Sequence, residues 1–363
     1  RWHHLWLKPF WLTLPLRAPC PARPPASCGE PRTAMLRRTA SAAAAAVHAG
    51  AGRHSSSSSL ASLVHAHAAA SPARLALAAP QQGVSWSYAE LSSRAARAAS
   101  ALAALGYARG DVLVTDLPNS AENLLLQIAA SHIGVAVGTV KDAAALEALR
   151  GAASVRGAVT CAEGSSPFLA GAALPTQAVV VEALDGSLAA LGNGEAQPAV
   201  AADAALALGY WSSTKPLTNR EALSEMGAAA RDRLAISAED RVLVSITLCH
   251  AFGIGSAAGS ALVAGAAIVL PGASGIRGCG SPGQRAQVTL EVLESQRCTL
   301  LFADVHTLKA LPAPNTADLS ALRGGACKVG SGADFLDDVV EAKLGPDGEM
   351  RPLVYGGATP GAA

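Results

Sequence analysis

Residues Leu208–Ala222, which read LGYWSSTKPLTNREA, form the stretch that decides the fold of this chain. Hydroxyl side chains follow an aromatic pair and lead to Lys215. Loops that bind phosphate usually contain glycine, because glycine reaches the positive-φ turns that point successive N–H groups at an anion. No glycine lies between Tyr210 and Lys215. The stretch therefore looks like a nucleotide-binding loop that has lost its central part.

Other segments carry further motifs, in a fixed order along the chain. They are Ser85–Leu105 with Arg109-Gly110-Asp111-Val112, Pro118-Asn119-Ser120, Ser245–Gly253, Gly330-Ser331-Gly332-Ala333, and Tyr355-Gly356 with Thr359. Together with Leu208–Ala222 they resemble the AMP-forming acyl-CoA synthetase (adenylate-forming) family. The order and spacing of these short motifs, from Leu60 to Thr359, carry the resemblance. It implies an α/β fold, the N-terminal large domain of that family, with parallel-rich sheets flanked by helices.

The resemblance also implies two groups of site residues. The degenerate nucleotide-binding group is Ser212, Ser213, Thr214, Lys215, Tyr355, Gly356 and Thr359. The acyl-pocket candidates are His250, Phe252, Gly253, Gly330 and Gly332. From the residues alone, a plainer interpretation is open for each group. The first loop would be an ordinary strand-to-helix connection capped by Asn219, and His250 a hydrogen-bonded histidine after an apolar strand.

Several departures from the family pattern weaken the implied chemistry. Pro216 follows Lys215 and removes a backbone donor. Pro360 stands where the resemblance implies a glutamate that helps to hold Mg²⁺, so no metal site is expected. The chain reaches Ala363 soon after the Tyr355-Gly356 motif. We therefore expect the ribose-binding aspartate, the hinge and the small domain with the catalytic lysine to be missing.

Two functional hypotheses remain. The first is an acyl-CoA synthetase-like protein that is catalytically inactive and is kept as a structural or accessory subunit of a mitochondrial assembly. Its partners would be other proteins of that organellar complex, with an acyl group as a further ligand and no cofactor. The alternative is a fragment of an active ATP-dependent carboxylate–CoA ligase that forms an acyl-adenylate and uses ATP, Mg²⁺ and CoA.

The N-terminal region is interpreted as a leader. Residues 1–34 show no periodicity and are expected to be unstructured or non-native, whereas residues 35–59 contain arginine, alanine and serine but no acidic residue. That composition is typical of an organellar transit peptide, mitochondrial (matrix side) or alternatively plastid. We expect cleavage between Arg53 and Leu63, and a partial AMP-binding domain over residues 60–363.

Composition excludes some classes of protein and partner. Half of the 363 residues are hydrophobic, enough for a large core, and the net charge of +1 argues against a nucleic-acid partner. The seven cysteines form no C-x-x-C pair and are expected to be reduced core thiols. The uncharged run Phe252–Ile276 is long enough to span a bilayer, but Gly265, Pro271 and Gly272 interrupt it, so no transmembrane span is expected.

Periodicity predicts alternating helices and strands. A capping box, Ser87-x-x-Glu90, predicts a helix that ends near Gly106, and Asn119-x-x-Glu122 predicts a second helix to about Ile133. The other predicted helices are Asp142–Arg150, Asn219–Leu234, Ile254–Ala264, Arg285–Ser295 and Asp334–Leu344. The predicted strands are Val112–Leu117, Val135–Val140, Gly157–Cys161, Ala178–Val181, Val242–Thr247, Ala266–Leu270, Thr299–Ala303 and Pro352–Tyr355. This rhythm predicts parallel sheets with helices on their faces.

Overall fold

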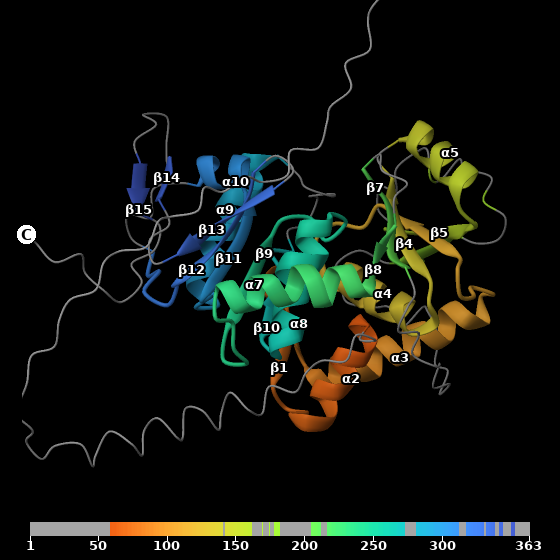
Figure 1. Cartoon of the computed structure of the whole chain (residues 1–363), viewed down its shortest axis with the longest axis horizontal. Helices are drawn as coiled ribbons and strands as arrows, with labels where there is room; N and C mark the ends of the chain where they lie inside the picture. Colours follow the sequence, from red (N-terminus) through yellow and green to blue (C-terminus); the bar gives the residue numbers. More distant parts are fainter. Residues whose placement is uncertain are drawn as a thin grey trace, which may run out of the picture. The chain divides into compact units, whose positions relative to one another are not determined.

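The computed structural model describes residues 59–140, 142–161, 169, 174, 178–181, 205–211, 216–272, 281–311, 317–329, 332–337, 341–343 and 350–352. Residues 1–58 of the predicted leader, residues 1–59, lie outside them. The described residues form two mainly parallel sheets with helices between and around them (Figure 1).

The larger sheet has seven strands in the order β13-β12-β11-β9-β10-β1-β2. Their bounds are β1 Leu75–Ala79, β2 Val84–Ser87, β9 Arg241–Ser245, β10 Ala267–Val269, β11 Leu300–Asp304, β12 Gly324–Val329 and β13 Gly332–Asp337. The five central strands run parallel, and β2 and β13 close the two edges in antiparallel orientation. Val242 of β9 pairs with Ile268 of β10 and Leu300 of β11, which places their apolar side chains at one level of the sheet.

The second sheet has six strands in the order β6-β5-β3-β4-β7-β8. Their bounds are β3 Val112–Thr115, β4 Ala136–Val140, β5 Val155–Cys161, β6 Ala178–Val181, β7 Ala205–Trp211 and β8 Leu217–Thr218. All pairs are parallel except β7 with β8. A separate antiparallel pair is formed by β14, Glu341–Lys343, and β15, Met350–Pro352.

Helices separate and cover the sheets. Their bounds are α2 Leu60–Ala70, η1 Pro80–Gln82, α3 Tyr88–Ala104, α4 Ala121–Ile133, α5 Ala143–Ala152, η3 Glu221–Gly227, α7 Ala228–Arg233, η4 Phe252–Gly259, α8 Ser260–Ala264, α9 Pro282–Ser295 and α10 Val305–Ala310. The predicted capping box of α3 is confirmed, since Ser87 and Glu90 bond each other's backbone N–H. Further boxes begin α2 at Ser59 and α9 at Ser281.

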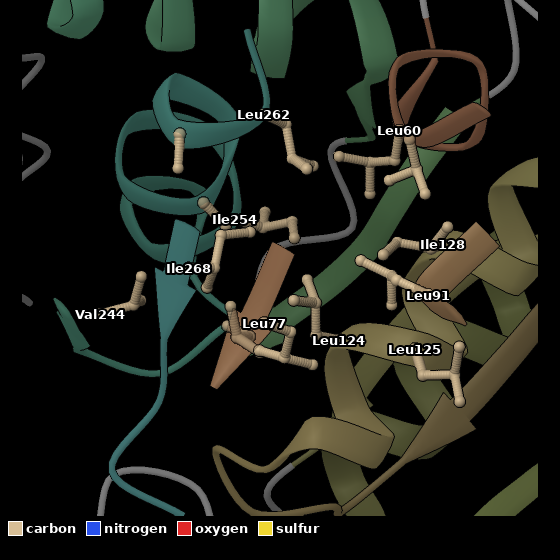
Figure 2. Packing of buried hydrophobic residues seen from close by; sticks show 14 of the residues in the cluster. Leu60, Leu77, Leu91, Leu124, Leu125, Ile128, Val244, Ile254, Leu262 and Ile268 are labelled. Atoms are coloured by element: carbon tan, nitrogen blue, oxygen red, sulfur yellow. The ribbon is translucent and has the colours of Figure 1, made fainter. Parts of the chain in front are cut away.

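One large hydrophobic cluster joins the inner faces of both sheets. It contains side chains from α2, α3, α4, η3, η4 and α8 as well as from strands of each sheet. In Figure 2, Leu77 of β1, Leu124 of α4 and Ile254 of η4 are seen within this cluster, and all three are fully buried. Two smaller clusters cover the outer faces, one under α9 and α10 and the other under α5. The fold therefore alternates helical and sheet layers.

Three predicted local features differ from the structure. The helix predicted over Asp334–Leu344 is wrong: Gly332–Asp337 is strand β13, and β14 follows. The backbone groups of β12 would be left open at the sheet edge, and β13 satisfies them by antiparallel pairing. The predicted cap Asn119 is also wrong, because Ser120 accepts from Asn123 N and caps α4.

The third difference is the form of two central helices. The segments predicted as α-helices from Asn219 and from Ile254 begin instead with π-helical turns, η3 and η4. These turns pack against each other through glycine, since a Cβ on Gly227 would lie 2.9 Å from the Gly259 carbonyl carbon. Because glycine has no side chain, the two backbones can approach closely at these positions.

No helix among the described residues is both long and apolar enough to span a lipid bilayer. The uncharged run that begins at Phe252 is divided in the structure. Its helical part ends at Gly265, which adopts the left-handed conformation with φ 72°, and the chain then enters β10.

Candidate functional site

The carboxyl ends of β9, β11 and β12 meet at one edge of the seven-stranded sheet. In parallel α/β sheets ligands bind at this edge, because the loops that leave the strands there converge. His250 lies in the loop after β9, Phe302 lies on β11, and Lys328 lies near the end of β12. The structure thus brings a histidine and a cation to the ends of neighbouring strands, beside a buried aromatic ring of β11.

His250 is held as a neutral imidazole. Burial, and next the charge of Lys328, lower the pKa of His250 to about 4. Its Nδ1 accepts a hydrogen bond from Phe252 N at 3.2 Å, so the neutral ring carries its proton on Nε2. At neutral pH the ring therefore carries no positive charge.

Phe252 and Gly253 shape the loop around His250. The Phe252 ring packs against Phe302 with centroids 5.8 Å apart and is 5% exposed. A Cβ on Gly253 would collide with the carbonyl oxygen of Thr247, so only glycine fits there. Both residues are buried, and in this structure they pack the loop that carries His250.

The start of α4 holds the same loop from the other side. Asn119 Nδ2 donates to Val244 O at 2.8 Å, and Asn119 Oδ1 accepts from Leu248 N at 3.2 Å. Gln127 Nε2 donates to Leu248 O at 3.3 Å. Sequence reasoning missed this role of Asn119, and no local signal in its motif points to partners more than a hundred residues away.

A second polar group lies at the start of α4. Gln82 Nε2 donates to Glu122 Oε2 at 2.7 Å, and Gln82 Oε1 accepts from Ala121 N at 2.9 Å. Glu122 is 2% exposed, and its Oε1 has no hydrogen-bond partner among the described residues. Gln82 thus satisfies the backbone N–H of Ala121 at the start of α4, as a helix cap would, and also binds the carboxylate of Glu122 in the first turn.

All seven predicted nucleotide-binding residues lie outside the described residues. These are Ser212, Ser213, Thr214, Lys215, Tyr355, Gly356 and Thr359; the acyl-pocket candidate Gly330 also lies outside them. Gly332 is the first residue of β13 and pairs with Val329. The structure therefore brings together the His250 part of the predicted site only.

The two ends of the glycine-free loop are described. β7 ends at Trp211, β8 begins at Leu217, and the two strands are antiparallel neighbours with Ala207 opposite Leu217. Residues 212–216 therefore connect two paired strands. Thr218 N donates to Glu221 Oε2 at 2.8 Å, and Glu221 N donates to Thr218 Oγ1 at 3.1 Å. This reciprocal pair caps the helical segment, which corrects the predicted cap Asn219.

Asn219 has a different role. It is fully buried, and its Oδ1 accepts from Leu60 N at 3.0 Å and from Ser131 Oγ at 3.3 Å. It therefore joins the start of α2 to the end of α4. In the sequence, a short polar residue at the start of a helix predicts a cap. In the fold, the side chain of Asn219 instead accepts from Leu60 and Ser131, which are distant in the sequence.

The structure also shows the surroundings of three cysteines and of the possible metal ligands. Cys249, Cys298 and Cys327 are buried thiols that form no disulfide, as predicted for core thiols, and burial raises the pKa of Cys298 to about 12. The side chains of the other four cysteines lie outside the described residues. Within the part of the chain that the structure describes, no three His, Cys, Asp or Glu side chains form a group that could hold a metal ion.

The chain is similar to known proteins in sequence and in fold. A family model described as AMP-binding enzyme matches residues 64–357. A search of curated proteins returns no match.

Solved structures share the fold at low sequence identity. The N-terminal domain of FACL13 from Mycobacterium tuberculosis has a TM-score of 0.62 at 16% identity, over 81% of this chain and 86% of that one. A putative long-chain-fatty-acid CoA ligase from Rhodopseudomonas palustris has a TM-score of 0.59 at 20% identity, over 76% and 70%. The anthranilate CoA ligase AuaEII, in complex with anthranoyl-AMP, has a TM-score of 0.63 at 16% identity, over 76% and 56%. The predicted α/β fold of a large N-terminal domain is confirmed.

Proposed function

Because the chain belongs to the AMP-binding enzyme family, we propose that it is an acyl-CoA synthetase-like protein that forms no acyl-adenylate and is kept as a structural or accessory subunit. One observation carries this proposal. The loop in the position of the nucleotide-binding loop contains no glycine and connects two paired antiparallel strands.

The residues around this loop do not fit a triphosphate. Adenylate formation builds negative charge on phosphate oxygens, which positioned N–H groups, hydroxyls and cations must stabilise. Pro216 has no N–H, and the N–H of Thr218 already donates to Glu221. The N–H groups of Pro216 and Thr218, at the far end of the loop, are therefore missing or already used. Pro360 also leaves the last motif without a carboxylate for Mg²⁺.

The proposal implies that the chain uses none of the cofactors ATP, Mg²⁺ and CoA. A member that keeps the fold but cannot hold the triphosphate has no use for any of the three as cofactors. The buried polar contacts of Asn119, Gln127 and Asn219, by contrast, hold the fold and need no nucleotide. The chain would thus keep its stability and surface without the family's chemistry.

An acyl ligand bound without turnover is a second element of the proposal. The observation that favours it is the neutral imidazole of His250 in the loop after β9, at the position that the resemblance assigns to the acyl pocket. Phe252, Gly253, Gly330 and Gly332 are the other proposed contributors to such a pocket. His250→Ala would then abolish the calorimetric binding of an acyl ligand, whereas His306→Ala, at an exposed position on α10, would leave it intact.

The location and partners are also proposals. The acid-free, arginine-containing stretch before Ser59 supports a mitochondrial matrix location, with a plastid as the alternative. Proteins of an organellar complex would be the partners. Co-migration of the endogenous protein with a large complex on native gels of purified mitochondria supports this role, whereas a free monomer in the matrix contradicts it.

The decisive experiment measures adenylation directly. Carboxylate-dependent exchange of labelled pyrophosphate into ATP is followed over short, medium and long acyl chains, with an active family member as the positive control. We expect no exchange above the no-enzyme rate. Exchange that disappears in Lys215→Ala would overturn the proposal and support the alternative, a fragment of an active carboxylate–CoA ligase.

A further inference from the structure

The beginning of α2 is docked on the end of α4. Leu60 is fully buried, and its N–H donates to Asn219 Oδ1, which also accepts from Ser131 of α4. Leu60 and Ile128 of α4 both belong to the large hydrophobic cluster, and Figure 2 shows them close to the start of α2. α2 is therefore held at this point by contacts with the last turns of α4.

His132 follows Ser131 in that last turn. Its side chain is only 6% exposed, and neither ring nitrogen has a hydrogen-bond partner among the described residues. A neutral imidazole already carries one donor and one acceptor, and both are left unsatisfied here. A second proton would add another donor and a full charge at a buried site where no described residue accepts a hydrogen bond from the ring.

The charges around His132 do not compensate for protonation. His65 of α2 is the titratable neighbour whose charge acts on the ring, and it is exposed. No described carboxylate or guanidinium of α3, β1 or β4, which also pack on α4, acts on it. Burial first, and His65 second, lower the pKa of His132. The C-terminal end of α4 favours a cation, but this effect is smaller than the burial.

We propose that His132, with His65 opposite it, makes the docking of α2 on α4 sensitive to acid. When the ring takes up a proton from solvent, we expect α2 to move away from α4 so that water reaches the ring. Movement of α2 away from α4 also separates the imidazolium groups of His132 and His65. The proposal is independent of the proposed function, because it concerns neither the loop after β7 nor the His250 site.

The sign of the pH dependence follows from linkage. A histidine whose pKa is lowered in the closed state binds more protons in the open state, whose pKa is about 6.5. The docking is therefore fully stable above about pH 6.5 and weakens as the pH falls below it. His250 contributes a dependence of the same sign to global unfolding, so the test must follow α2 locally.

Hydrogen–deuterium exchange of the full chain, read by mass spectrometry at pH 7.5 and pH 5.0 and corrected for intrinsic rates, tests the proposal. We expect the opening constant of α2 to rise by up to about thirtyfold at pH 5.0, while amides in β9 and β11 change less. His132→Leu removes the titration, and the rise should be lost. His132→Gln provides the same test with a polar neutral side chain if His132→Leu does not fold.

Two histidine variants serve as matched controls. His306→Gln, at an exposed position of α10, and His250→Gln, at the site after β9, should leave the rise in α2 unchanged. The proposal is overturned if the opening of α2 does not depend on pH in the wild-type chain. It is also overturned if the dependence persists in both His132 variants.

Discussion

At the scale of single residues, buried polar side chains tie distant parts of the backbone together. Asp240 is the most highly connected of them. Arg323 reaches its two oxygens through Nη2 at 2.9 Å and Nε at 3.1 Å, and Thr299 Oγ1 and Ser237 N add donors at 2.8 Å each. Arg323 Nη1 continues to Leu234 O. The end of α7, the start of β9 and the start of β12 are thus joined around one carboxylate.

Asp240→Asn should lower the free energy of unfolding by about 2–3 kcal/mol at neutral pH, because Arg323 would lose its charged partner. Burial acts to raise the pKa of Asp240, but the hydrogen bonds from Arg323, Ser237 and Thr299 prevail and lower it. The stabilisation is therefore present above the unfolded-state pKa near 4 and is lost as the pH falls through the lower folded pKa.

Urea denaturation of both chains between pH 7 and pH 3 measures this effect. The difference between wild type and Asp240→Asn should shrink as the carboxyl becomes protonated. Asp232→Asn is the control, since Asp232 pairs with Arg231 on the exposed surface of α7. A difference that stays constant down to pH 3 would contradict the assigned role.

At the scale of elements, the close approach of η3 and η4 depends on glycine. Gly227, Gly255 and Gly259 lie where the two π-helical segments meet, and Ala222 provides the facing backbone. π-helical turns are rare because they widen the helix. Here this widening occurs in the central helical layer, where the backbone of one segment fits against the other.

Gly227→Ala should destabilise the chain by about 1–3 kcal/mol, because the new Cβ would lie 2.9 Å from the Gly259 carbonyl carbon and 3.0 Å from Ala222 O. Backbone atoms cannot move aside as a flexible side chain can. Gly151→Ala is the matched control: Gly151 is an exposed helical glycine of α5 with nothing within 4 Å of an added Cβ.

The control should be neutral or stabilising by about 0.4–1 kcal/mol, since alanine is the better helix former and restricts the unfolded chain. Thermal unfolding followed by circular dichroism distinguishes the two variants. Equal effects of the two substitutions would show that helix propensity, and not the contact between η3 and η4, determines the result.

At the scale of the whole molecule, the two sheets share one core and one set of polar contacts. Asn119 follows β3 of the six-stranded sheet. Its side chain bonds the backbone of Val244 in β9 of the seven-stranded sheet and that of Leu248 in the loop after β9. Hydrophobic burial alone would join the sheets but would not fix how the loop that carries His250 lies on α4.

Asn119→Asp should destabilise the chain by about 2 kcal/mol, because the new carboxylate can accept from Leu248 N but would face Val244 O with no donor. It should also release the loop around His250. The exchange of amides at residues 246–250, measured by mass spectrometry, would then rise more than that of α5.

Gln287→Ala is the control for this substitution, because Gln287 bonds Glu291 on the exposed face of α9. It should change stability by less than about 0.5 kcal/mol. Protection at residues 246–250 that is unchanged in Asn119→Asp would show that Asn119 does not hold this loop.

The sequence by itself determined the α/β class, the family, most helices, and the strands β3 to β6 and β9 to β11. Periodicity and capping depend on residues only a few positions apart, as Ser87 with Glu90 demonstrates. Only the tertiary structure decided the partners of Asn119 and Asn219, the strand β13 and the unsatisfied ring of His132. The partners of Asn119 and Asn219 depend on distant segments that the folded chain brings alongside, and β13 depends on the open edge of β12. A competing local signal, such as a capping position or a helical period, cannot reveal these contacts.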